Sequence, residues 1–197
     1  WTETLFLNFR EDRFHPVAIM ASPYRRLIAV IVGGIIAAII WYLMQRRLRH
    51  PARVSAAVKG TAMPFWRTMV DVTTQVLYVG TGGSVGRELA PREAGAMLAQ
   101  QWQRWVANHP RLVINGDDRH LLVAAAAGAG FAGVYIAPIT GTMFCVEILY
   151  RKVSARVLAV ALTMSSIATV IGGLIKNWDP YYEVTDKAFS LKLLPLA

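Results

Sequence analysis

The sequence has a single cysteine and only four histidines among its 197 residues. One cysteine cannot form a disulfide within the chain, so a disulfide-stapled extracellular scaffold is excluded. Cys145 lies inside an apolar run, where packing is its expected role. The histidines are scattered without metal-ligand spacing, and no Ser–His–Asp or Cys–His set can be placed. We therefore expect no metal, no cofactor, no catalytic residues and no enzymatic activity.

Charged residues are also scarce, at 17% of the chain. Three long stretches contain none: Leu27–Met44 with 18 residues, Leu121–Val146 with 26 and Val157–Ile175 with 19. About 18 or more uncharged apolar residues are typical of a membrane-spanning helix. Three such stretches in one short chain argue against a soluble domain. The fold class predicted is all-α, a polytopic helical bundle in the lipid bilayer of the cell membrane.

The charge that remains is mostly basic, and the net charge is +9. Basic residues gather at the ends of the apolar runs, which is the pattern of cytoplasmic loops. They are Arg46, Arg47, Arg49 and Arg53 after the first run, and Arg151, Lys152 and Arg156 between the second and the third. This arrangement does not favour nucleic acid as a partner.

Three segments are expected along the chain. Residues 1–23 are polar and aromatic and indicate a loop or an interfacial segment. Residues 24–176 hold the membrane helices, and residues 177–197 are an extracytoplasmic linker or the start of a further helix. The chain opens with Trp1 and shows no signal-peptide pattern, so we expect it to be part of a longer protein.

Several helices are expected to be short or interrupted. The expected helices cover 24–45, 53–59, 66–79, 94–106, 121–134, 139–150 and 154–176. A glycine cluster ends the expected helix 66–79, and Ala137-Pro138 interrupts the helical segment after 121–134. Interrupted helices are tolerated in a bilayer only where the broken backbone faces protein or a water-filled path. Such breaks commonly build ion and substrate sites.

The stretch GTGGSVGRELAP, residues 80–91, is the candidate site. Gly80, Gly82 and Gly86 resemble a dinucleotide-binding turn, but no strand precedes them. The glycines could instead serve only tight helix packing. A third interpretation rests on the helix that begins after them, because its free N–H groups and its dipole attract an anion. Glu88 then supplies a carboxylate that can occupy the same place, and a carboxylate within a membrane indicates function.

Two motifs in this order resemble one family. GTGGSVGRE followed by a proline resembles the GREGP signature of CLC chloride channels and proton/chloride antiporters. AAAAGAGFAGVYIAPITGTMFCVEI resembles their helix pair, AAAGFAAAFNAPLAGVLFxxE in general form. The resemblance covers about residues 24–176. It implies one half of a CLC-type inverted repeat, a homodimer, and the movement of chloride or a similar anion.

The resemblance also implies residue roles. Glu88 matches the gating glutamate, and the backbone of Gly86, Arg87, Glu88, Leu89 and Ala90 matches the amide end that holds the anion. Glu147 matches the first glutamate of a pair that follows the AP segment, which makes it a candidate for a proton pathway.

The sequence departs from the family pattern at three places. Pro91 lies one position late, and Ile148 replaces the second glutamate of the pair. The family's GSGIP segment is missing near residues 52–56, where Ser55 is the only hydroxyl. A membrane scaffold that transports nothing, or a decayed relative, is therefore an alternative. A soluble nucleotide-binding enzyme is a second alternative, from another class of protein.

Further charged residues have expected roles because of where they lie relative to the predicted helices. We expect Arg87 to hydrogen-bond carbonyls at the start of its helix and, with equal weight, to add positive potential there. Glu93 is expected to lie in that helix's first turn. Asp71 is expected near the cytoplasmic surface. Asp117 or Asp118 is expected to cap the helix that follows it.

Overall fold

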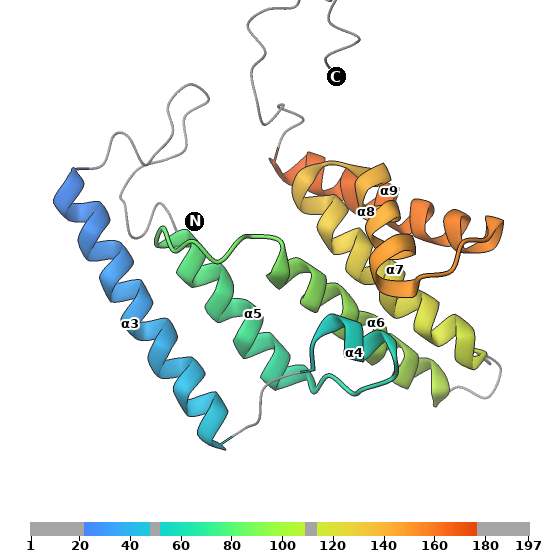
Figure 1. Ribbon diagram of the computed structural model, residues 1–197, viewed down its shortest axis with the longest axis horizontal. Helices are drawn as coiled ribbons and strands as arrows, with labels where there is room; N and C mark the ends of the chain where they lie inside the picture. Colours follow the sequence, from blue (N-terminus) through green and yellow to red (C-terminus); the bar gives the residue numbers. More distant parts are fainter. Residues whose placement is uncertain (1–21, 48–51, 109–113, 177–197) are drawn as a thin grey trace, which may run out of the picture.

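A computed structural model describes residues 22–47, 52–108 and 114–176 (Figure 1). The predicted segments 1–23 and 177–197 lie almost entirely outside the described residues. Within the described residues every regular element is a helix. The elements are α3 (Pro23–Arg47), α4 (Val54–Val58), α5 (Phe65–Gly80), α6 (Leu89–Ala107), α7 (Gly116–Tyr135), α8 (Pro138–Met143), the π-helix η1 (Phe144–Tyr150) and α9 (Ala155–Lys176). The all-helical prediction is confirmed.

Helix α7 is the centre of the bundle, with α6 on one side and α9 on the other. Helix α5 packs on α6, and α3 packs on α5 at the edge (Figure 1). Helix α7 reaches this position because its middle is built from alanine and glycine, and the alanines from 124 to 127 are buried. Small side chains let helix axes approach closely in a membrane bundle, which is how this sequence selects its neighbours.

Glycines on three helices bring backbones into direct contact with α7. A Cβ added at Gly95 would overlap the carbonyl oxygen of Ala126, and one at Gly130 would overlap that of Pro91. A Cβ at Gly172 would overlap the carbonyl oxygen of Gly133. The two seams, α6 with α7 and α7 with α9, are therefore closed by backbone rather than by side chains. We call them the glycine seams.

The uncharged run 121–146 is not one helix. Helix α7 ends at Tyr135, Ile136 adopts a left-handed conformation with φ 53°, and Pro138 starts α8. Proline fits the first turn of a helix because its missing N–H has no partner there. The predicted break at Ala137-Pro138 is confirmed. Helix α8 continues into η1, which ends at Tyr150 and is followed by Arg151, again left-handed with φ 58°.

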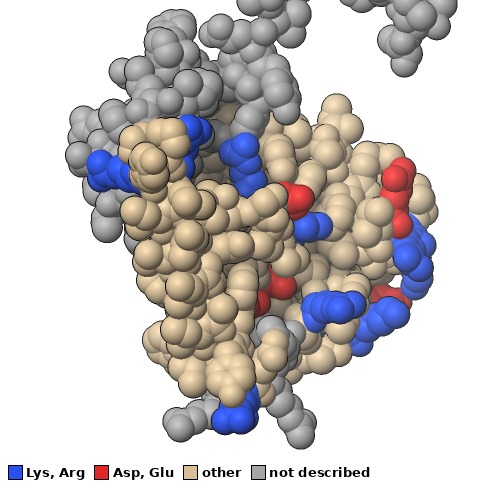
Figure 2. Space-filling model, turned by 60° about the vertical axis from the view of Figure 1, so that its left-hand side comes forward, with Lys and Arg blue, Asp and Glu red and all other residues tan. Residues whose placement is uncertain are grey.

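Two described helices are long and apolar enough to cross a membrane, Pro23–Arg46 of α3 and Ala155–Ile175 of α9. Much of the apolar surface of α3 is exposed, including Leu27, Ile31, Ile35 and Ile39. Figure 2 shows this as a broad uncharged face with basic side chains at its ends. A helix with this face requires an apolar surrounding.

Three predicted details of the helix starts are wrong. Helix α6 begins at Leu89 rather than near residue 94, because residue 88 already has helical backbone angles. Glu93 consequently falls in the second turn. Asp117 and Asp118 lie inside the first turn of α7, where carboxylates interact favourably with the positive end of the helix dipole. The N-cap position belongs to Asn115, whose side chain makes no capping bond.

Candidate functional site

The loop between α5 and α6 depends on glycine at two positions. Gly82 has φ +98° and Gly86 has φ +84°, conformations that cost little only for glycine. Because α5 is a helix and not a strand, the dinucleotide-turn interpretation is wrong. The two left-handed residues turn the chain from the end of α5 into the start of α6.

Glu88 lies at the N-cap of α6 and turns its side chain back over the loop. Its carboxylate covers the open face of Gly86, where an added Cβ would lie 3.0 Å from Oε2. The hydroxyl of Tyr135, at the end of α7, donates a hydrogen bond of 3.2 Å to the same oxygen. The Glu88 side chain does not cap α6. The carboxylate is thus held beside the helix end without being bonded to its N–H groups.

The other residues predicted to hold an anion lie where expected, in the loop and first turn. Gly86 and Arg87 are exposed, Leu89 is half-buried, and Ala90 is buried. The side chain at the N-cap of α6 makes no capping bond to the first turn. Its N–H groups therefore keep the positive end of the helix dipole available.

Arg92 supports the same helix start, a role that was expected of Arg87. The Nε of Arg92 donates to the carbonyl oxygen of Glu88 at 2.8 Å. Its guanidinium also lies over two aromatic rings, 5.8 Å from the centre of Phe131 and 5.1 Å from that of Phe144. The role of Arg92 was not predicted, because its hydrogen bond goes to a backbone carbonyl four residues earlier. Every residue has such a carbonyl, so no sequence motif marks the contact.

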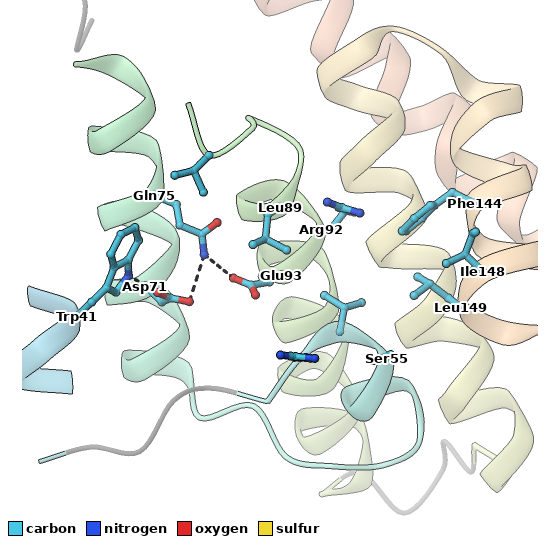
Figure 3. A pocket seen from close by; sticks show the side chains of 13 residues that line it. Trp41, Ser55, Asp71, Gln75, Leu89, Arg92, Glu93, Phe144, Ile148 and Leu149 are labelled. Carbon is cyan, nitrogen blue, oxygen red and sulfur yellow. Dashed lines mark hydrogen bonds between the residues drawn. The ribbon is translucent and has the colours of Figure 1, made fainter. Parts of the chain in front are cut away.

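A cavity of about 650 Å³ lies beside the start of α6 (Figure 3). Five elements line it, from α3 to η1. Its lining brings Ser55 of α4 and Leu89 of α6 to one space, together with Arg92. Ile148 of η1 also lines the cavity, whereas Glu147 is exposed and does not. The segments that carry the motifs, around Ser55, Leu89 and Ile148, therefore meet at this cavity, but the Glu147 side chain does not line it.

One wall of the cavity carries a polar cluster that the sequence did not predict, formed by Trp41, Asp71, Gln75 and Glu93. Asp71 and Glu93 are 6% and 7% exposed, so both are interior carboxyl groups. Glu93 lies in the second turn of α6 rather than in the first turn, where it was expected. The spacing of Asp71 and Gln75, one helical turn apart in an apolar helix, was the available signal.

Within residues 22–47, 52–108 and 114–176, no group of three or more His, Cys, Asp or Glu side chains is placed to hold a metal ion. The site consists of the start of α6, the carboxylate of Glu88 and the adjacent cavity.

Comparisons with known proteins point to one family. The family model described as voltage gated chloride channel matches residues 33–197. The voltage-gated ClC-type chloride channel ClcB of Escherichia coli O81 (strain ED1a) is 28% identical over 183 residues. ClcB of Shigella boydii serotype 18 (strain CDC 3083-94 / BS512) is likewise 28% identical over 183 residues. Each alignment covers 90% of this chain and 42% of the relative.

The chain thus spans less than half the length of the curated relatives it matches. No solved structure matches it. The family model covers most of the chain, including the glycine loop, the start of α6 and the broken helix pair. A soluble nucleotide-binding enzyme is excluded by this match and by the helix before the glycine loop. The chain belongs to the voltage-gated chloride channel (CLC) family of membrane proteins.

Proposed function

We propose that this chain forms part of a pathway for chloride or a similar small anion, and that Glu88 is its gate. The observation that carries the proposal is the position of the Glu88 carboxylate. It lies over Gly86 beside the uncapped start of α6, where an anion would be attracted. A tethered carboxylate in this place competes with the anion and must leave before the anion passes.

The cavity supports the proposal by its position. It adjoins Leu89 at the helix end and Ser55, the hydroxyl nearest to the missing GSGIP segment. The backbone amides from Gly86 to Ala90 and the Arg87 charge are the proposed anion contacts. Weak binding by backbone dipoles suits conduction, because an ion must also be released.

The wider organisation is proposed on the family resemblance. Residues 24–176 form one half of a CLC-type inverted repeat, and residues 177–197 lead out of it on the extracytoplasmic side. The working unit is a homodimer in the cell membrane. Glu147 remains a candidate for proton transfer, and its side chain is exposed on η1.

Anion efflux from liposomes tests the gate. The Glu88→Gln variant removes the charge while keeping the side chain's size, so the pH dependence that the gate imposes on efflux should be lost. Asp117→Asn is the matched control, because Asp117 is an exposed carboxylate on α7 far along the chain from the site. If Glu88→Gln leaves both the efflux rate and its pH dependence as in the unaltered protein, Glu88 is not the gate.

A further inference from the structure

The polar cluster on the cavity wall holds two carboxyl groups and one amide. Asp71 and Gln75 lie one turn apart on α5, and Glu93 faces them from α6 (Figure 3). The Nε2 of Gln75 donates to Asp71 Oδ2 at 3.1 Å and to Glu93 Oε2 at 2.8 Å. Because both oxygens lie within hydrogen-bond distance of one nitrogen, the two carboxyl groups are close neighbours.

The hydrogen-bond donors that contact the pair are uncharged. They are the indole of Trp41 and the amide of Gln75. Two cationic side chains, Arg53 and Arg92, line the same cavity. Arg92 donates a hydrogen bond to the Glu88 carbonyl oxygen, and its guanidinium lies over two aromatic rings.

Among the described residues that line the cavity, no further titratable group lies beside the pair. Helix α3 supplies Trp41, and the end of the α8–η1 pair supplies Phe144, Ile148 and Leu149. Two carboxylates this close repel each other. A proton or cation bound between them would relieve the repulsion.

The amide of Gln75 gives an independent sign that a hydrogen-bond donor binds here. Gln75 is 4% exposed, and its Oε1 has no hydrogen-bond partner. A buried acceptor without a donor is rare in folded proteins. Rotation of the amide by half a turn would present Oε1 to the carboxyl pair, where it could accept a hydrogen bond from a carboxyl proton.

We propose that Asp71, Gln75 and Glu93 form a proton-binding site in the cavity wall, separate from Glu88. One proton is held between the two carboxyl groups, and the Gln75 amide turns to match the occupied or empty state. Glu93 lies five residues beyond Glu88, which is about 7.5 Å along the axis of α6. Loss of the proton would add a negative charge to the wall and disfavour anions in the cavity.

A proton fits the site better than a metal ion. Trp41 Nε1 donates to Asp71 Oδ1 at 2.8 Å, and Gln75 Nε2 donates to both carboxyl groups. These donors occupy the lone pairs that a metal would require. Only two carboxyl groups and one amide oxygen are available, whereas Ca²⁺ takes about six to eight oxygen ligands.

Infrared difference spectroscopy of the complete protein in lipid tests the site directly. The stretching band of a protonated carboxyl group, identified by its shift in heavy water, should be present at neutral pH. The measurement uses the Glu88→Gln background, so that a proton on the proposed gate does not contribute. Glu93→Gln and Asp71→Asn should each remove the band, because the single carboxyl group that remains can ionise.

Asp117→Asn in the same background is the control and should keep the band. The proposal is overturned if no such band exists at neutral pH, or if it survives both cluster substitutions. It is also overturned if sodium or potassium ions replace the proton, seen as a carboxylate band that responds to the salt and is lost in Glu93→Gln. Whether the band exists at neutral pH is decided with the unaltered cluster, so this outcome does not depend on the folding of a cluster variant. Failure of the Glu88 gate would leave all these results unchanged.

Discussion

At the scale of single residues, the contact between Tyr135 and Glu88 joins the two motifs of the sequence. The hydroxyl of Tyr135 is the donor that holds the Glu88 carboxylate over Gly86. A hydrogen bond to a charged group stabilises the position of both partners. If Glu88 is the proposed gate, Tyr135 favours its blocking position beside the start of α6.

Tyr135→Phe should consequently increase anion efflux. The loss of one hydrogen bond is worth about 1 kcal/mol, which corresponds to a factor of about five in the ratio of blocked to open positions. Efflux from liposomes is measured for this variant, for Glu88→Gln and for the double variant. In the double variant the tyrosine substitution should add little, because the carboxylate is already gone.

Tyr150→Phe is the matched control, since Tyr150 belongs to η1 and has no contact with Glu88. Equal efflux from Tyr135→Phe and the unaltered protein would show that the contact does not hold the gate. An undiminished increase in the Glu88→Gln background would show that the tyrosine acts elsewhere.

At the scale of helices, Ile136 is the most strained connection. Its left-handed backbone lets α7 stop at Tyr135 and α8 start at Pro138. A β-branched residue with positive φ is a genuine outlier, whereas asparagine visits this conformation readily. The general family form quoted above has asparagine in the position before AP.

Ile136→Asn should therefore stabilise the fold by about 1 kcal/mol, the difference in cost of the left-handed conformation. Thermal unfolding in detergent measures the change. Ile136→Val keeps the β-branch and should not be stabilising, which makes it the control. A lower unfolding temperature for Ile136→Asn than for Ile136→Val would mean that apolar packing outweighs backbone strain.

The helices themselves were largely predictable from the sequence, and the contacts between them were not. The uncharged runs, the glycine cluster and Ala137-Pro138 gave most boundaries within a few residues, because backbone chemistry acts locally. The start of α6 was misplaced because Glu88 takes helical angles without a capping side chain. The partners of Asp71 and Glu93 depend on how α3, α5 and α6 pack, which no local pattern encodes.

At the scale of the whole molecule, the glycine seams decide stability. Gly172 faces the backbone of Gly133 so closely that an added methyl group has no space. By contrast, a Cβ at Gly34 of α3 would make only ordinary contact, 3.7 Å from the ring of Tyr78. The two sites lie in helices of similar apolar character, so they form a matched pair.

Gly172→Ala should destabilise the fold by about 1–3 kcal/mol, the usual cost of overpacking. Gly34→Ala should be neutral or stabilising by up to about 1 kcal/mol, because alanine is the better helix former. Unfolding temperature and the yield of folded protein in detergent measure both. Equal behaviour of the two variants would show that α7 and α9 separate easily.

The seams also determine which second mutations could repair such damage. An overlap between two side chains can be relieved by shortening either one. At Gly95, Gly130 and Gly172 the atom in the way is a main-chain oxygen, which every amino acid carries. No substitution on the facing helix can remove it, so a suppressor screen on Gly172→Ala should return only true revertants or changes that shift a whole helix.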